Sequence, residues 1–368
     1  NAISNEMSGD TQLGVQRIVE IDVETDSQIS DVKLTISNTA FSEVNNASVD
    51  KLSISTSVAT VTFDKSALEA IEDAASGDVT INIATVDVST LSLTADVRAA
   101  VSDRPVYDFT LTRGNTVISD FNGGLATVVI PYTLREGEDP NAIVVYYLDN
   151  EGKLKMTIGV YDTETNTVKT VLSHFSKYVV GHNEVPFDDV AKDAWYYPSA
   201  TFVNARNLFN GILNANLFEP NSNVTRAMFV QIFANIEGAD LSGYSTSPYL
   251  DVDINSPYGP AIAWATEKGI VVGGGNGIFA PDEEISREQM ALILYNYMKY
   301  KGITFPEVQS KTFTDSSSIS SWAADAVYTM TRYGIINGGS NNMFVPRGKA
   351  QRASVATIIM NFIKAWVK

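Results

Sequence analysis

The sequence has no cysteine and only two histidines among its 368 residues. Without cysteine there can be no disulfide, no thiolate nucleophile and no thiolate ligand for a metal. His174 and His182 both lie near the end of the first half, so the second half lacks an imidazole for acid–base chemistry. No Gly-x-Ser-x-Gly motif surrounds His174. These absences predict a chain that is not an enzyme, that needs no cofactor and that has no thiolate metal site.

Long apolar runs and positive charge are scarce as well. No run of about 18 or more apolar residues could span a bilayer, and residues 1–13 lack a signal-peptide pattern. The signal of an exported protein would then lie upstream of Asn1. The net charge of −17 opposes sequence-independent binding to nucleic acid or to an anionic membrane. An acidic ligand would have to be recognised by local groups.

Internal repeats dominate the second half. Three segments align on Arg226, Arg287 and Arg352, which follow the aspartate of an aromatic-x-Asp opening by 37, 36 and 37 positions. Glycine-containing turns lie at 210–212, 272–274 and 337–339, and Phe-x-Pro segments lie at 218–220, 279–281 and 344–346. Because chance does not keep such anchors in register three times, we predict tandem repeats at 184–245, 246–308 and 309–368.

Each repeat has the periodicity of two helices joined by a loop. Apolar pairs precede each turn: Ala200 and Val203, Ile262 and Ala265, and Val327 and Met330. A second helix begins after a capping hydroxyl of Thr225 or Ser286. Its apolar stripes are Phe229, Ile232, Phe233 and Ile236, then Met290, Ile293, Leu294 and Tyr297, and finally Val355, Ile358, Ile359 and Phe362. Since no helix pair can bury such a stripe alone, we predict an α-helical pseudo-trimer with a central three-helix bundle.

The first half has the composition of β-structure. Segments rich in Val, Ile and Thr predict strands at 51–62, 78–88, 126–132, 143–148 and 153–160. Turns are predicted at 149–152 and 163–167, and one helix at 66–75 with Asp64 or Ser66 as its cap. A break at 103–105 divides this half into modules at 1–104 and 105–183, unless the two form one domain. The chain is therefore predicted to be multidomain, with β-rich modules before the helical repeats.

The repeat anchors resemble those of the S-layer homology family, from Phe187 to the end of the chain. The resemblance implies a cell-surface protein whose inter-repeat grooves bind the secondary cell wall polymer of Gram-positive bacteria, often through pyruvylated N-acetylmannosamine. The stretches 104–111, 130–132 and 144–148 resemble β-modules that precede such repeats in clostridial surface proteins. Those modules have no activity that could be carried over.

The repeats contain residue types suited to such an acidic sugar. A pyruvyl ketal presents a carboxylate, and an arginine in the first turn of a helix adds its donors to the free backbone N–H groups there. Aromatic rings stack on sugars, aspartates accept hydrogen bonds from hydroxyls, and glycines let backbone approach the ligand. The predicted ligand-binding residues are Arg226, Arg287 and Arg352, Trp195, Tyr258 and Trp322, Asp189, Asp251 and Asp315, and Gly211, Gly273 and Gly338.

Each residue type also has a structural interpretation. An arginine at a helix start can pair with a neighbouring carboxylate, the tryptophans can belong to the core, and the aspartates can cap turns. The repeats are also unequal, since Gln351 replaces the capping hydroxyl and Asn207 replaces a glycine found in the other two copies. We therefore expect the grooves with Arg226 and Arg287 to bind best, and Arg352 to matter least.

Other functions fit parts of the pattern less well. The adjacent Asp188 and Asp189 cannot flank a substrate at the separation of roughly 5–10 Å that glycoside hydrolysis needs. The glycine-rich segment 273–277 lacks the Lys-Ser/Thr of a phosphate-binding loop. Calcium stays open, since 251–253 and 162–164 are rich in oxygen ligands but lack EF-hand spacing. The alternatives kept are a self-associating lattice or adhesion protein acting through its β half, the non-catalytic part of a larger surface enzyme, and binding to peptidoglycan itself.

Overall fold

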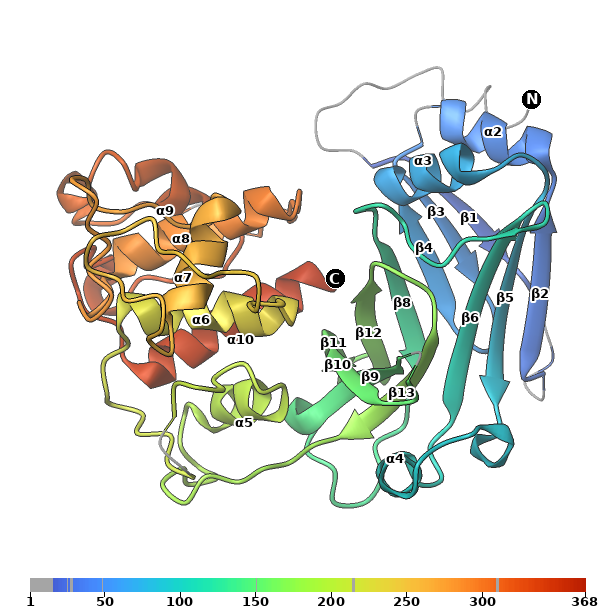
Figure 1. Cartoon of the computed structure of the whole chain (residues 1–368), viewed down its shortest axis with the longest axis horizontal. Coiled ribbons are helices and arrows are strands. Elements are labelled where there is room, and N and C mark those ends of the chain that lie inside the picture. The colour runs from blue at the N-terminus through green and yellow to red at the C-terminus, as the bar shows by residue number, and fades with distance from the viewer. Residues whose placement is uncertain are drawn as a thin grey trace. The chain divides into compact units, whose positions relative to one another are not determined.

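The computed structural model describes residues 16–368 except Thr25, Ser27, Gln28, Ser48, Asn150, Asn214, Ala215, Gln309 and Ser310. The chain forms two compact units, one ending at Asn183 and the other beginning at Glu184 (Figure 1). The first unit is rich in strands and the second is helical, as the sequence predicts. No helix in the described part of the chain is both long enough and apolar enough to cross a membrane.

The described strands of the first unit form two sheets that share one apolar core. The first sheet has the order β1 (Ile18–Asp22), β3 (Lys51–Ser55), β4 (Thr60–Asp64), β8 (Ala126–Pro131), β12 (Thr167–Leu172) and β11 (Gly159–Asp162). The second has the order β10 (Leu154–Thr157), β9 (Ile143–Leu148), β13 (Lys177–His182), β6 (Val106–Arg113), β5 (Val79–Val86) and β2 (Asp31–Ile36), with β7 (Thr116–Val117) on β6. Only the pair β1–β3 is parallel among these described strands. Phe63 and Phe121 of this core meet edge to face, with ring centroids 5.8 Å apart.

The helices of the first unit are α2 (Asn38–Asn46), α3 (Lys65–Ala74) and α4 (Ala95–Val101), with short 3₁₀ turns at Val88–Thr90 and Pro140–Ala142. The predicted helix at 66–75 is confirmed as α3. Its cap is Asp64, whose carboxylate accepts a 2.8 Å hydrogen bond from the Ala67 N–H.

Two of the strand predictions are wrong for the same reason: each predicted segment contains two strands instead of one. Residues 51–62 contain the hairpin β3–β4, turned where the Thr56 hydroxyl and N–H both bond the Ala59 carbonyl. Residues 153–160 divide at Ile158 into β10 and β11, which belong to different sheets. An unbroken run of strand-forming residues gives no sign of the point at which the chain turns or changes sheet. The turns at 149–152 and 163–167 are confirmed.

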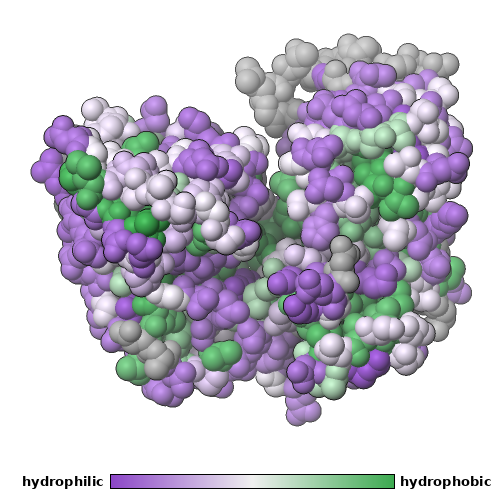
Figure 2. Space-filling model, in the orientation of Figure 1, coloured by the Kyte–Doolittle hydropathy of each residue, from purple (hydrophilic) through white to green (hydrophobic). Residues whose placement is uncertain are grey.

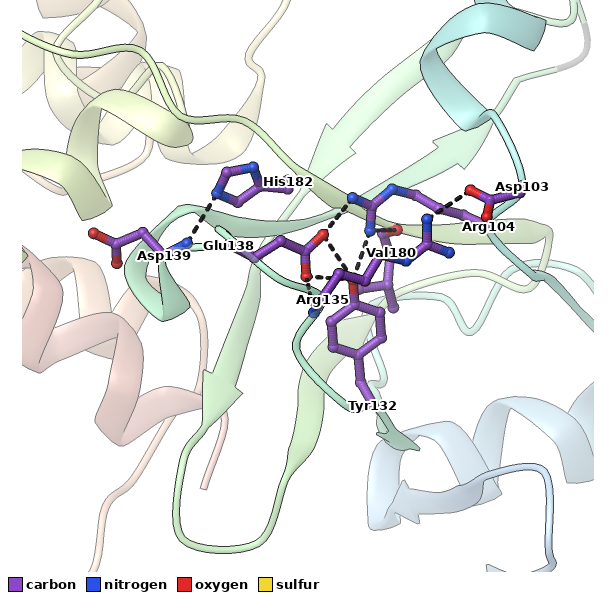
Figure 3. Close-up of polar contacts among 8 residues, drawn as sticks. All are labelled: Asp103, Arg104, Tyr132, Arg135, Glu138, Asp139, Val180 and His182. Atoms are coloured by element: carbon purple, nitrogen blue, oxygen red, sulfur yellow. Dashed lines mark hydrogen bonds and ion pairs between the residues drawn. The ribbon is translucent and has the colours of Figure 1, made fainter.

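The break at 103–105 does not separate two modules. Both sheets combine strands from before and after this point. Figure 3 shows that Arg104, which lies at this break, belongs to a polar network with residues of the strands and loops that follow it. Its guanidinium donates to the Tyr132 hydroxyl (2.6 Å) and the Val180 carbonyl (3.3 Å), and pairs with Glu138. Residues 16–183 are therefore one unit, the alternative kept in the sequence analysis.

The second unit contains α5 (Tyr197–Ala205), α6 (Arg226–Glu237), α7 (Gly259–Glu267), α8 (Arg287–Tyr300), α9 (Ala324–Arg332) and α10 (Arg352–Trp366), with 3₁₀ turns at Ser316–Ser318 and Ser340–Asn342. Each repeat is a helix, a loop and a helix, as predicted. The apolar pairs of the first helices are all buried, and so are the stripes of the second helices except Ile236, which is partly buried.

The three repeats are joined in a closed cyclic order. The second helix of each repeat packs on the first helix of the next: α6 on α7, α8 on α9, and α10 back on α5. Just before the second helices, three equivalent residues are linked head to tail by backbone hydrogen bonds. Val224 N–H donates to Ala350 (2.9 Å), Ala350 N–H to Ile285 (3.2 Å), and Ile285 N–H to Val224 (2.9 Å). Each repeat therefore finds partners in both of the others.

Candidate functional site

The second helices begin where they were predicted to begin, but their first amides are not free. Thr225 and Ser286 cap α6 and α8 through their hydroxyls, and Gln289 completes a capping box in α8. The two N–H groups that follow each cap donate to carbonyls of the next repeat. These bonds join Arg226 to Glu283, Ala227 to Pro281, Arg287 to Gly348, Glu288 to Pro346, Arg352 to Ser222 and Ala353 to Pro220, at 2.9–3.1 Å. The expectation of free amides for a ligand is thus wrong, because neighbouring backbone occupies them.

The side chains of Arg226 and Arg287 enter the loop of the following repeat in the same way. Arg226 donates from Nε to the Phe279 carbonyl (2.9 Å) and from Nη2 to the Val272 carbonyl (3.4 Å). Arg287 donates from Nε to Phe344 (2.7 Å) and from Nη2 to Asn337 (2.9 Å). Both guanidinium groups also lie over the ring of that phenylalanine, 4.6 and 5.1 Å from its centroid. In both, Nη1 donates to no residue that the structure describes, so it is available to a ligand.

Burial lowers the pKa of both Arg226 and Arg287, and nearby carboxylates partly oppose this shift. Glu283 is the strongest opposing charge for Arg226, and Asp315 for Arg287. Both side chains stay protonated, because the pKa of arginine lies far above neutral pH. A buried cation with an unused donor is an attractive partner for an anion that enters the groove.

Arg352 differs from the other two arginines. It donates from Nη1, not Nε, to the equivalent Phe218 carbonyl (3.1 Å), and from the same Nη1 to the Glu219 carboxylate (2.6 Å). Its Nη2 donates to the Ile212 carbonyl at 3.4 Å. Its Nε is buried and has no hydrogen-bond partner among the described residues. The alternative of an arginine paired with a neighbouring carboxylate therefore applies to this copy.

The opening aspartates hold the Phe-x-Pro segments. Each carboxylate accepts two backbone N–H groups at 2.7–2.8 Å: Asp189 from Phe218 and Glu219, Asp251 from Phe279 and Ala280, and Asp315 from Phe344 and Val345. The second donor of each pair has a positive φ, of 49°, 58° and 57° respectively. Since side-chain residues disfavour this conformation, the aspartates stabilise a strained loop. Whether they also contact a ligand stays a prediction.

These bonds lower the pKa of two of the aspartates, Asp251 and Asp315. Burial alone would raise the pKa of Asp251, but the N–H groups of Phe279 and Ala280 outweigh it and lower the pKa below its usual value. The pKa of Asp315 is lowered against burial by the N–H groups of Phe344 and Val345. Both carboxylates are thus ionised at neutral pH.

The three loop glycines have different surroundings. A Cβ on Gly273 would lie 2.6 Å from both the Ile278 carbonyl and the Tyr249 ring. On Gly338 it would lie 2.7 Å from the Phe313 ring, whereas nothing lies within 4 Å of a Cβ on Gly211, whose φ is +78°. Gly273 and Gly338 are therefore required for close packing under the opening aromatic residue, and Gly211 is favoured by its backbone conformation.

The predicted stacking residues are at the surface. Trp195 is 68% exposed and Trp322 is 52% exposed, so neither belongs to the core. Tyr258 is half-buried, and its hydroxyl donates a 3.0 Å hydrogen bond to the Gly211 carbonyl of the preceding repeat. On the face shown in Figure 2, hydrophobic residues of this unit form small patches within a hydrophilic surface.

A groove of about 370 Å³ brings three of the predicted residues together. Arg226 of the first repeat, Gly273 of the second and Trp322 of the third all line it, beside Gln289 and Asn296 of α8. In the sequence the candidate residues recur once in each repeat, whereas this groove is lined by one candidate residue from each of the three repeats. A charged donor, a close-packed loop and an exposed ring therefore converge there.

Sequence reasoning missed an asparagine that recurs nine positions after each arginine, at 235, 296 and 361. Asn235 donates to the carbonyls of Leu208 and Asn210 (2.9 Å each), and Asn296 donates to Ile270 (3.3 Å). These amides hold the start of the loop against the second helix. The exact repeat spacing was the signal that could have revealed them. Glu219 was missed because no other copy has an acidic residue there.

The three repeats match a known protein family. The family model of the S-layer homology domain matches residues 186–228, 248–291 and 312–356. The chain is 30% identical over 239 residues to an amylopullulanase of Thermoanaerobacterium thermosulfurigenes, which covers 64% of this chain and 13% of that protein. It is 29% identical over 146 residues to a cellulosome-anchoring protein of Acetivibrio thermocellus, with 39% and 32% covered. It is 25% identical over 140 residues to S-layer protein EA1 of Bacillus anthracis, with 36% and 16% covered.

The chain spans less than a third of the length of each of these relatives. The match to the amylopullulanase covers 64% of the chain, which is more than the half that forms the second unit, so it reaches into the first unit. No group of three or more His, Asp or Glu residues in the described part of the chain is arranged to hold a metal.

Proposed function

Since residues 186–356 carry three tandem S-layer homology domains, we propose that the second unit anchors a bacterial surface protein to the cell wall. The ligand in this proposal is a secondary cell wall polymer, recognised through pyruvylated N-acetylmannosamine. The observation that carries the proposal is the groove that is lined both by Arg226, with an unused Nη1, and by the exposed ring of Trp322. The guanidinium group of Arg226 suits a carboxylate, and the indole ring of Trp322 suits the face of a sugar.

The chemistry of the groove explains how a strongly acidic chain binds an acidic glycan. The net charge of −17 repels the polymer at long range. Within the groove, burial reduces screening of the Arg226 charge, so a carboxylate that enters gains a charge-assisted hydrogen bond. Backbone carbonyls at Val272 and Phe279 fix the guanidinium before the ligand arrives, which lowers the entropy cost of binding. Recognition is local and preorganised.

We also propose that the three second helices form the central bundle of a pseudo-trimer. Tyr297 of α8 supports this arrangement, since its ring lies 4.7 Å from Phe233 of α6 and 5.8 Å from Phe362 of α10. Its hydroxyl donates to Glu237, which also pairs with Lys301 at 3.1 Å. The cyclic hydrogen bonds of Val224, Ala350 and Ile285 give the same connectivity.

Co-sedimentation of the chain with cell walls tests the anchoring function. We expect the protein to pellet with native walls and to stay in the supernatant after acid has removed the secondary polymer. Arg226→Ala should weaken binding about tenfold or more, since a charge-assisted hydrogen bond contributes roughly 1.5–3 kcal/mol. Arg332→Ala, at an exposed arginine paired with Glu307, is the matched control. Equal binding to stripped walls would refute the polymer and indicate peptidoglycan instead.

We propose that the chain is the non-catalytic, wall-attached part of a larger surface protein. The similarity to an amylopullulanase supports this, because it covers most of this chain but only 13% of that protein. A lattice built through the first unit is the other candidate. Sedimentation velocity of the chain at high concentration distinguishes the two, since a clean monomer would contradict lattice assembly.

A further inference from the structure

Glu219 distinguishes the first Phe-x-Pro segment from the other two. It occupies the middle of the Phe-x-Pro segment in the first repeat, where the other repeats have Ala280 and Val345. Asp189 fixes its backbone by accepting the N–H groups of Phe218 and Glu219, and φ is +49° as in the other copies. The three loops thus share one backbone conformation at this position. At this position the first loop differs from the other two in its side chain.

That side chain changes how an arginine is used. The Glu219 carboxylate lies 2.6 Å from Nη1 of Arg352, and the two side chains are 37% and 5% exposed. Arg226 and Arg287 bond the phenylalanine carbonyl through Nε and keep Nη1 unused, whereas Arg352 bonds it through Nη1. The guanidinium of Arg352 is therefore rotated toward Glu219, and its Nε is left buried without a partner among the described residues. The charge-assisted bond to Glu219 compensates for this loss.

We infer that Glu219 closes the Arg352 groove to acidic sugars by supplying a carboxylate from the chain itself. This inference rests on the proposed function, because it concerns the same ligand class. A ligand carboxylate would have to displace the Glu219 carboxylate, which the chain itself holds beside Arg352. While both carboxylates were present, the negative charge of Glu219 would repel the ligand. Arg226 and Arg287 face Ala280 and Val345 at this place, and although Glu283 lines the Arg226 groove, both arginine side chains donate only to backbone carbonyls among the described residues. The protein then has two working grooves out of three.

Two reciprocal substitutions test the inference. Positions 219 and 280 are equivalent in their repeats, and both have a positive φ. Alanine already adopts this conformation at 280 (+58°) and glutamate adopts it at 219 (+49°), so the backbone tolerates both Glu219→Ala and Ala280→Glu. The experiment is isothermal titration calorimetry of the full chain with pyruvylated N-acetylmannosamine. We expect two sites in the wild type, three in Glu219→Ala and one in Ala280→Glu.

The site counts separate the inference from the proposed function. Two sites in both the wild type and Glu219→Ala would overturn the inference while leaving the function intact. No site in the wild type but one in Glu219→Ala would support the closure by Glu219 and overturn binding at the other two grooves. No site in either protein would overturn both.

Discussion

The backbone N–H of Val224 donates a 2.9 Å hydrogen bond to the carbonyl oxygen of Ala350, which joins the first repeat to the third. Through Ile285 the same pattern connects the third repeat to the second and the second to the first. The arginines repeat this order, since each enters the loop of the next copy. The three repeats of this chain are thus linked to one another in a closed ring.

Removal of residues 309–368 should therefore unfold the two repeats that remain. Without the third repeat, α5 loses its packing against α10, and the Phe218 carbonyl loses Arg352. All four tryptophans lie in the second unit, and the truncated chain keeps Trp195 and the buried Trp264. Tryptophan fluorescence during heating should show a sharp transition in the full chain and none in the truncated chain, whose tryptophans are already exposed to solvent. A sharp transition at an unchanged temperature in both would contradict the cyclic dependence.

Asp251→Asn should destabilise the second unit by about 1–3 kcal/mol, since one carboxylate oxygen becomes an amide that cannot accept the second N–H group. The wild-type carboxylate accepts from Phe279 and Ala280, and these bonds hold Ala280 at its positive φ. Urea denaturation followed by tryptophan fluorescence measures the loss. Asp193→Asn, at an exposed aspartate, is the matched control. Equal stabilities of the two variants would show that the paired bonds contribute little.

The sequence predicts the repeats well because their helices obey local rules. The caps at Thr225 and Ser286 and the stripe that ends at Tyr297 depend only on residues within a few positions of one another. In the first unit, local rules fail at Ile158 and at 56–59, where the chain turns or changes sheet inside a run of strand formers. Sheet membership depends on distant pairing that composition does not encode.

The candidate site was predicted as a set of residue types but not as a set of neighbours. Arg226 and Trp322 share a groove although they belong to the first and third repeats. Their presence in one groove follows from the cyclic order of the repeats, which no spacing within one repeat reveals. The sequence predicts that the aspartates contact a ligand, yet Asp251 already uses both of its oxygens on backbone N–H groups. A buried carboxylate takes the nearest donors, and those are visible only in three dimensions.

Gly273→Ala should reduce both stability and wall binding, because its Cβ would lie 2.6 Å from the Ile278 carbonyl and from the Tyr249 ring. The loop must shift to relieve this overlap, and Val272, whose carbonyl positions Arg226, would shift with it. Gly211→Ala should cost only about 1 kcal/mol, since it meets no neighbour and suffers only from its positive φ. Urea denaturation and wall co-sedimentation measure the two effects. Weaker binding by the Gly211 variant than by the Gly273 variant would contradict this account.

The first unit should become less stable as the pH drops below 6.5, the ordinary pKa of histidine. Burial lowers the pKa of His174, and the nearby charge of Asp120 opposes this only partly. Its ring packs edge to face on Tyr147, with centroids 4.8 Å apart. Because the folded state binds a proton more weakly than the unfolded state, the stability is fully present above the ordinary pKa of 6.5 and is lost as the pH falls through the lowered value.

His174→Phe tests this dependence, because it keeps an aromatic ring against Tyr147 and removes the proton. The first unit contains no tryptophan, so tryptophan fluorescence during unfolding in urea reports on the second unit alone, and a transition seen by far-UV circular dichroism without a matching change in fluorescence belongs to the first unit. The wild type should lose stability as the pH is lowered from 6.5 toward the range in which carboxylates titrate, and the variant should stay level across that window. The second unit, which has no histidine, should respond equally in both proteins. Parallel losses of stability in the first unit of both proteins would assign the pH dependence to groups other than His174.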